Sequence, residues 1–205
     1  MREWYKYLLE ENVSMRDIDE EGRRELVPCR IELAHRNTSW DESYRLSRLR
    51  GLTPAEKSLL FCIIHELLPS NYRLNRVNPA TNPSCSLCNS GEDETYPHIF
   101  ITCSANSEAM GSLLQCIRSY SDNDDEENYL RLNIGADDPF SLPTVILLAK
   151  GCGLVWSNRK LRKETSKYEM RAELEARVQL LRKCRSSRLR EAGDIITNMI
   201  ENFFR

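Results

Sequence analysis

Residues 85–103 read CSLCNSGEDETYPHIFITC, and four of them form the pattern Cys-x2-Cys-x9-His-x4-Cys: Cys85, Cys88, His98 and Cys103. Two cysteines three positions apart bring two thiolates to one ion from a tight turn, and the histidine and third cysteine complete a tetrahedral shell. Zinc is redox-inert, and four protein ligands leave it no open position for water. The pattern, in the order CCHC, therefore predicts one structural Zn2+ in a zinc knuckle and not a hydrolytic centre.

The chain around these ligands is polar. Asn, Pro, Ser, Gly and acidic residues dominate positions 78–97, so we expect an irregular loop that hydrophobic burial alone does not hold. Metal binding would supply the missing folding energy. The alternative is that the cysteines are unrelated buried thiols and His98 is a surface histidine.

Helices are predicted on both sides of this loop. Thr53-Pro54-Ala55-Glu56 has the residues of a capping box, with proline at the first helical position. The run from Leu59 to Leu68 is apolar on nearly every face, which predicts a central, buried helix that Pro69 ends. Ser70 can cap a short helix through Leu74, and residues 107–120 have apolar side chains at helical spacing.

The chain from Ser141 onward is also predicted to be helical. Residues 145–156 supply core side chains, and Leu174, Val178 and Leu181 recur at helical spacing on a strongly charged helix. We expect Gly193 to break this helix and Asp194 to cap a last amphipathic helix.

The predicted fold class is therefore mostly α: a helical domain with an irregular Cys3His zinc-knuckle loop and a long basic C-terminal helix. Four segments are expected along the chain. They are an N-terminal helical segment (1–52) with a first helix near 3–11, a helical core with the zinc knuckle (53–120, knuckle 80–103), an acidic linker (121–140) and a C-terminal helical region (141–205).

Composition limits the function classes. The 205 residues carry 29 Lys or Arg against 31 Asp or Glu, a net charge of −2, which argues against DNA binding over the whole surface. The N-terminus has no continuous apolar stretch of a signal peptide, and the most apolar window, 142–156, is interrupted by Lys150. We expect an intracellular protein of the nucleus or cytoplasm, with reduced cysteines and no membrane partner.

Other polar clusters give weaker signals. Cys62 and His65 share a helix face and could form a second metal site with Cys29, although a core histidine beside a small buried thiol is the commoner arrangement. The acidic run 122–127 lacks the spacing of a calcium loop. No phosphate-binding loop, dinucleotide motif or nucleophile elbow is present, so we predict that the chain is not an enzyme.

One segment is strongly basic. Residues 159–190 contain twelve Lys or Arg and four Glu, a net charge of +8. The segment is either a helix that tracks nucleic-acid phosphates or a solvated helix face with i, i+4 ion pairs. The candidate phosphate contacts are Arg159, Lys160, Arg162, Lys163, Arg182, Lys183, Arg185, Arg188 and Arg190, and Tyr72 with Arg73 could stack on a base.

The motif resembles the zinc-binding segment at the C-terminus of non-LTR (LINE-type) retrotransposon reverse transcriptases. Cys-Ser-Leu-Cys, Glu94-Thr95, His98-Ile99-Phe100 and Cys103 carry the resemblance. The stretch from Leu68 to Leu74 is similar to the family's leucine-proline and leucine-arginine segment, and Val155-Trp156-Ser157-Asn158-Arg159 to its tryptophan-arginine helix. The resemblance spans roughly Trp40 to Arg190.

The resemblance implies a region that follows the polymerase and helps it hold template RNA or target DNA. We therefore expect a non-catalytic, zinc-stabilised nucleic-acid-binding module, with RNA as the first partner and DNA as the second. The chain has no paired-aspartate polymerase motif of the Tyr-x-Asp-Asp kind. We therefore expect either an excised fragment or a host gene derived from such an element.

The rival interpretation is a protein–protein adaptor, whose zinc only staples the fold and which acts inside a larger complex. Its contact surface would be the apolar face of the last helix, with the basic helix facing an acidic partner. The residues of that face are Ile196, Ile200, Phe203 and Phe204.

Overall fold

The computed structural model describes residues 39–120, 126–132, 134 and 140–204, and the chain from residue 39 onward forms one compact unit. Its elements are α3 (Trp40–Ser47), α4 (Pro54–Ile64), α5 (Asn71–Val77), the π-helical turn η1 (His98–Thr102), α6 (Ser107–Arg118), α7 (Glu126–Leu130), α8 (Ser141–Lys160), α9 (Lys167–Arg182) and α10 (Ser187–Phe203). Among the described residues there is no strand, only an isolated bridge between Ser84 and Asp93. The predicted mostly helical fold is confirmed.

Helix α8 is the centre of the packing. It contacts α3, α4, α6, α9, α10 and η1, and most of its side chains are buried. A helix that is apolar on every side cannot lie on a surface, because each face needs a packed neighbour. Lys150, the one charged residue in its middle, reaches Glu173 of α9 at 2.6 Å.

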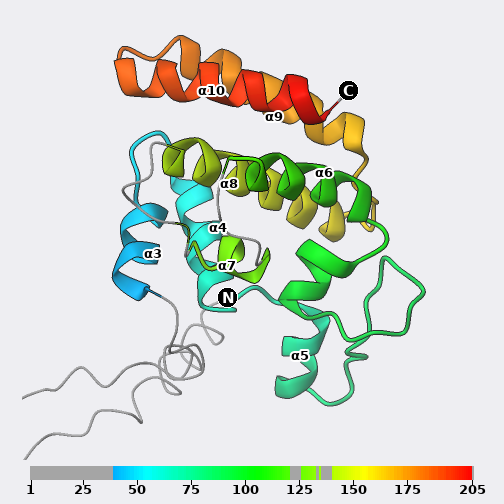
Figure 1. The fold of residues 1–205 in the computed structure, drawn as a ribbon. Coiled ribbons are helices and arrows are strands. Elements are labelled where there is room, and N and C mark those ends of the chain that lie inside the picture. Colours follow the sequence, from blue (N-terminus) through cyan, green and yellow to red (C-terminus); the bar gives the residue numbers. More distant parts are fainter. Residues whose placement is uncertain (1–38, 121–125, 133, 135–139, 205) are drawn as a thin grey trace, which may run out of the picture. The chain divides into compact units, whose positions relative to one another are not determined.

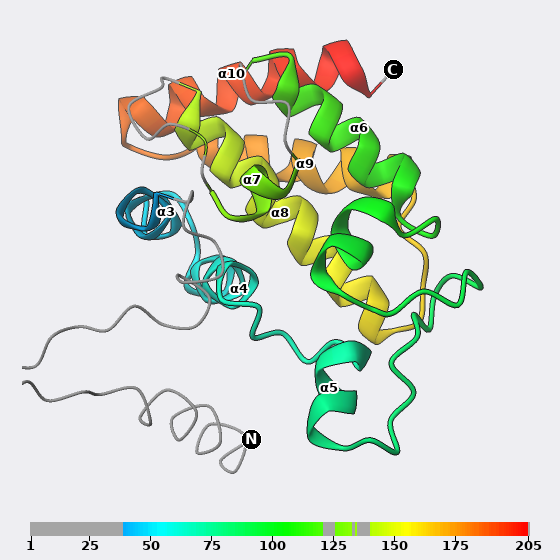
Figure 2. The same cartoon turned by 60° about the horizontal axis from the view of Figure 1, so that its bottom comes forward.

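The other helices cover α8 from two sides. Helices α9 and α10 form an antiparallel hairpin that packs over α6 and α8, while α4 contacts α8 from the other side and α3 lies beside α4 (Figure 1). Figure 2, turned by 60°, shows α5 and the loop of residues 78–97, called the zinc-ligand loop below, beside the C-terminal end of α8. The helices before and after residues 121–140 share one hydrophobic core.

Two of the helix starts that were predicted from cap residues are found, whereas Asp194 lies inside α10 and caps no helix. The Thr53 hydroxyl accepts a hydrogen bond from the Glu56 amide at 3.2 Å, and the Glu56 carboxylate accepts one from the Thr53 amide at 2.7 Å. The Ser70 hydroxyl likewise accepts from the amide of Arg73 at 3.3 Å and begins α5.

Two details differ from expectation. Helix α4 is not buried on every face, since Phe61 is 45 % exposed and α8 takes the central place instead. The long basic helix is interrupted at residues 183–186, between α9 and α10, and not at Gly193. Gly193 lies inside α10, where a Cβ atom would approach the Cβ of Leu181 to 3.3 Å, so this glycine permits close packing of the hairpin.

Parts of the sequence-based prediction lie outside the described residues. The first helix expected near 3–11 is among them, as is Cys29. Most of the acidic run 122–127 is also outside, and its last two residues begin α7.

Within the described part of the chain, none of the helices combines the length and the apolar character needed to cross a lipid bilayer.

Two helical glycines give a matched test of the packing around α8. A Cβ at Gly151 would overlap the Cδ2 atom of the fully buried Leu113 and lie 3.4 Å from the Met170 sulfur, whereas a Cβ at Gly111 meets nothing within 4 Å. We expect Gly151→Ala to lower the free energy of unfolding by about 1 kcal/mol or more through overpacking. Gly111→Ala should raise it by about 0.5–1 kcal/mol through helix propensity. Urea denaturation of both variants checks the signs, and equal stabilisation by both would contradict the close approach of α8 to α6.

Candidate metal centre

The first two ligands lie on a short hairpin-like turn. The Cys85 amide donates to the Glu92 carbonyl at 2.9 Å, and the Glu94 amide donates to the Pro83 carbonyl at 2.8 Å. Gly91 has a φ of +75° at the return of the chain, a backbone conformation that glycine adopts without steric cost. The turn places Cys85 and Cys88 side by side, as the Cys-x2-Cys spacing predicts.

The other two ligands lie at the ends of η1. The Cys103 amide donates to the His98 carbonyl at 2.8 Å, which closes one wide helical turn between these residues. Ile99 and Phe100, inside this turn, are 2 % and 0 % exposed and anchor it in the core beside α6 and α8. The hydrophobic core therefore fixes two ligands, and the polar turn supplies the other two.

The four donor atoms converge. The Sγ atoms of Cys85, Cys88 and Cys103 and a ring nitrogen of His98 all lie within 4.8 Å of one another. The Cys85 and Cys103 sulfurs are 3.8 Å apart, and the Cys88 sulfur is 3.2 Å from His98 Nε2. Zn–S bonds of about 2.3 Å in a tetrahedron put two sulfurs about 3.8 Å apart, so the donor set fits zinc.

The histidine ring is oriented by its second nitrogen. His98 Nδ1 lies 2.8 Å from a carboxylate oxygen of Glu92 and 3.2 Å from the Thr102 hydroxyl. A carboxylate that accepts from one ring nitrogen fixes the tautomer and leaves the other nitrogen as a metal donor. Nε2 faces Cys88, and this is the arrangement that a zinc-bound histidine requires.

Thiol ionisation in the cluster is uneven. Burial raises the pKa of the Cys88 thiol, but hydrogen bonds from Ser90, Cys85 and His98 outweigh it and bring that pKa to about 6. Burial, together with the neighbouring Cys85 and Cys88, raises the pKa of Cys103 to about 12. Thiolates crowded in this way repel one another, and a bound dication would relieve the repulsion. The cluster fits one structural zinc ion with all four positions taken by protein.

A buried ion pair attaches the zinc-ligand loop to the helical core. The Glu94 carboxylate is 0 % exposed and accepts hydrogen bonds from the Arg159 guanidinium of α8, with Nε 2.9 Å from Oε1. The same carboxylate accepts from the Asn71 amide at 2.7 Å, and Arg159 also donates to the Asn71 side-chain oxygen at 3.3 Å. Loop, α5 and α8 therefore meet at one carboxylate.

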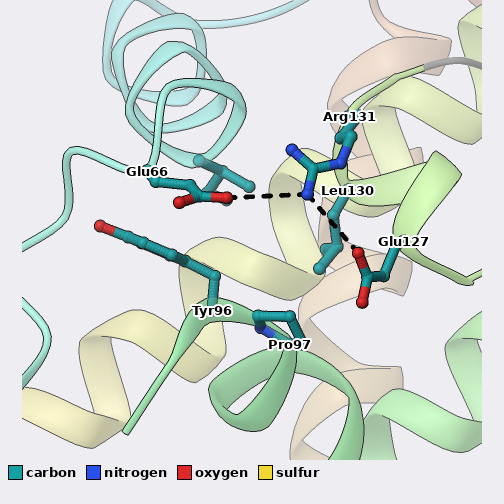
Figure 3. A pocket seen from close by; sticks show the side chains of 7 residues that line it. Glu66, Tyr96, Pro97, Glu127, Leu130 and Arg131 are labelled. Carbon is teal, nitrogen blue, oxygen red and sulfur yellow. Dashed lines mark hydrogen bonds and ion pairs between the residues drawn. The ribbon is translucent and has the colours of Figure 1, made fainter. Parts of the chain in front are cut away.

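A small cavity lies on the other side of the loop, between α4, α7 and the residues before His98. Figure 3 shows Arg131 between Glu66 and Glu127, at 3.6 and 3.5 Å, above Tyr96. The Tyr96 hydroxyl donates to the Leu68 carbonyl at 2.7 Å, and its burial raises the pKa of the phenol. A volume of about 20 Å³ admits one water molecule and no substrate.

The predicted nucleic-acid contacts near the loop fall into two groups. Tyr72, Lys160 and Arg162 are exposed. Arg73 turns inward and donates to the Glu66 carbonyl at 2.7 Å, and Lys163 pairs with Glu169 at 2.8 Å. Arg159 is committed to Glu94 and also stacks over the Trp156 ring, with its Cζ 4.8 Å from the centroid.

The remaining predicted contacts lie around the turn between α9 and α10. Arg182 pairs with Asp194 at 3.2 Å, and Arg190 donates to the carbonyls of Cys184 and Arg185 at the end of α9. The exposed cations of this turn without such contacts are Lys183, Arg185 and Arg188.

The apolar face of the last helix points into the protein. Ile196, Ile200 and Phe204 are 1–2 % exposed, and Phe203 packs half-buried against the same core. The amphipathic pattern that suggested a protein-binding face is therefore explained by the packing of α10 on α6, α8 and α9. An adaptor would need another surface.

Cys62 and His65 are not drawn into a metal cluster among the described residues. His65 instead stacks in an aromatic group, with its ring centroid 5.5 Å from Tyr44 and 4.3 Å from Phe61. Burial raises the pKa of the Cys62 thiol, as expected of a thiol that is not a ligand. The arrangement favours the core-histidine interpretation.

Sequence reasoning did not single out Glu92 or Glu94 as functional groups. Both lie inside the ligand motif, where charged side chains are expected to be exposed to solvent on a polar loop. An acid between metal ligands is the available signal for a histidine-orienting group such as Glu92. Nothing local signals the partner of Glu94, which is 65 residues away.

Zinc retention can be tested with two cysteines. Cys103→Ser removes a buried ligand, so we expect the purified protein to fall from one zinc per chain toward none. Cys184→Ser is the matched control, because the Cys184 thiol lies outside the ligand cluster and donates to the Leu180 carbonyl, a bond that serine reproduces. Elemental analysis of protein purified without chelator gives the answer, and full zinc in Cys103→Ser would refute the ligand assignment.

The buried ion pair gives a second test. Arg159→Met leaves the Glu94 carboxylate buried without its cation, so we expect a loss of about 3–5 kcal/mol in the free energy of unfolding. Adding Glu94→Gln should recover part of that loss, because a neutral amide oxygen still accepts from the Asn71 amide. Denaturant unfolding measures both, and an equal or larger loss in the double variant would show that the charge is not what matters.

Comparison with known proteins adds one match. Residues 35–109 match the family model described as zinc-binding in reverse transcriptase, which includes all four ligands, α3, α4, α5 and η1. No match was found among curated proteins or among solved structures. The motif, its ligand geometry and this match agree, and residues 35–109 are similar to the zinc-binding region of reverse transcriptases.

Proposed function

We propose that the chain is a non-catalytic, zinc-stabilised nucleic-acid-binding module that prefers RNA and also accepts DNA. One observation carries the proposal: the Glu94–Arg159–Asn71 contacts join the start of α5, which carries an exposed aromatic ring, to the end of α8, which carries exposed cations. Tyr72 follows Asn71 in α5, and Lys160 follows Arg159 at the end of α8.

The pair of features suits single-stranded nucleic acid. Tyr72 is 40 % exposed and can offer its ring face to a base, a contact that tolerates any sequence. Lys160 and Arg162 are exposed at the end of α8, where their charges can meet the phosphates beside that base. A base-stacking ring flanked by cations is the usual form of such sites.

Zinc supports this surface indirectly. The metal orders the loop that carries Glu94, and Glu94 in turn holds the start of α5 against the end of α8. Tyr72 and Lys160 are 88 residues apart in sequence, and the hydrogen bond between their neighbours Asn71 and Arg159 joins the two helix ends that carry them. Binding should therefore depend on zinc although the metal touches no nucleotide.

The adaptor interpretation has less support. Its predicted contact face is buried in the core, as described above. A protein partner within a larger complex remains compatible with the nucleic-acid proposal, since the family's zinc-binding regions belong to polymerases.

Tyr72 gives the direct test of this function. In fluorescence anisotropy with a labelled oligouridine RNA, Tyr72→Ala should cost about 1–3 kcal/mol of binding free energy through loss of stacking. Tyr72→Phe should bind like the unmodified protein, because the ring is kept. Affinity of the unmodified protein should fall steeply as salt rises. Salt-independent binding, or no binding of the zinc-loaded protein, would reject the proposal.

A further inference from the structure

The loop between α3 and α4 lies against the start of α10. A Cβ atom at Gly51 would overlap the Cδ2 atom of Leu189, so the two backbones approach closely at this point. Arg177 of α9 donates to the Gly51 carbonyl and pairs with Glu56 at 2.8 Å, which fixes the loop from the other side. Figures 1 and 2 both show this loop beside the turn that joins α9 to α10.

The contact brings together cations from two distant parts of the chain. Arg48 and Arg50 precede Gly51 in the loop, and Lys183, Arg185 and Arg188 surround the turn before Leu189. All five are exposed, and within the described part of the chain their side chains make no ion pair. We call these five residues the composite basic surface.

Two of the acidic side chains nearby are already paired. Asp194 pairs with Arg182, and Glu56 pairs with Arg177. Glu191 is the exposed acid that follows the turn, so the surface keeps a clear positive excess. Five like charges in one place repel one another, and an anionic ligand with several charges relieves that repulsion.

We propose that the composite basic surface binds the phosphate backbone of RNA. The inference rests on the proposed function and adds Arg48 and Arg50, which the basic segment 159–190 does not contain. It also joins the matched region, residues 35–109, to the helical hairpin beyond it in one binding surface.

A nucleic acid fits this surface better than an acidic protein does. Protein interfaces depend on apolar or aromatic anchors. Here Leu49 and Leu189 are half-buried in the packing, and Ser186 and Ser187 lie between the cations. Leu180, one turn earlier on α9, is a single exposed leucine, which is ordinary on protein surfaces.

The composite basic surface is separate from the Tyr72 surface. Gly51 lies near Ile146 in the first half of α8, and Arg159 is near its end. Ile146 and Arg159 are thirteen positions apart, which corresponds to about 20 Å of helix. Substitutions at one surface therefore leave the residues of the other in place.

The test uses the zinc-loaded full chain and a fluorescein-labelled oligouridine RNA. We expect Arg48→Glu with Arg50→Glu to weaken binding by about tenfold or more at low salt, and to make the slope of log K against log salt shallower by about 1.4. Arg185→Glu with Arg188→Glu should do the same. Arg48→Lys with Arg50→Lys is the matched control and should keep the slope, because the charges remain.

The outcomes separate this inference from the proposed function. Unchanged RNA binding by Arg48→Glu with Arg50→Glu, together with loss in Lys160→Glu with Arg162→Glu, would overturn the inference and leave the proposed function standing. Absence of salt-dependent RNA binding in the unmodified chain would overturn both. Displacement of the RNA by polyglutamate at equal charge concentration would point to an acidic protein and overturn the inference. Thermal unfolding of each variant confirms that the fold is kept.

Discussion

The arrangement of the zinc-ligand loop, α5 and the end of α8 depends on the hydrogen bonds and the ion pair of the Glu94 carboxylate. This carboxylate is wholly buried, and a buried charge is tolerated only when it is paired and hydrogen-bonded. Arg159 supplies the countercharge from α8, and the Asn71 amide supplies a further donor from the first residue of α5. Three segments are therefore positioned by one side chain, and directional hydrogen bonds fix their geometry in a way that non-directional burial does not.

Apolar packing stabilises one part of the described chain, and hydrogen bonds together with the ligand cluster stabilise another. Around α8, apolar side chains from α4, α6, α9 and α10 form a continuous core, and close approaches such as Gly151 to Leu113 show how tightly it is packed. Residues 78–97 contribute little to that core, and their order depends on hydrogen bonds and on the ligand cluster. Ile99 and Phe100 link the two systems, because the same turn that buries them carries His98 and Cys103.

Short-range features could be predicted from the sequence, and long-range ones could not. The ligand set, the capping box at Thr53 and the start of α5 at Ser70 each depend on residues within a few positions of one another. The Glu94–Arg159 pair spans 65 residues, and neither residue has a local pattern that names its partner. Gly193 looked like a helix breaker, but tertiary packing decides the role of a glycine, and the hairpin needs its small size inside α10.

Counting charges along the chain also misjudges where a basic surface lies. The segment 159–190 has a net charge of +8, yet three of its arginines are in ion pairs within the protein. Arg159 pairs with Glu94, Arg177 with Glu56 and Arg182 with Asp194. Arginine serves such pairs well because its planar fork satisfies a carboxylate and a carbonyl together. A cation paired in this way stabilises the fold, and its neutralised charge attracts an anionic ligand only weakly. The usable charge is what remains exposed and unpaired after folding, and folding adds to it Arg48 and Arg50 from a loop more than a hundred residues earlier.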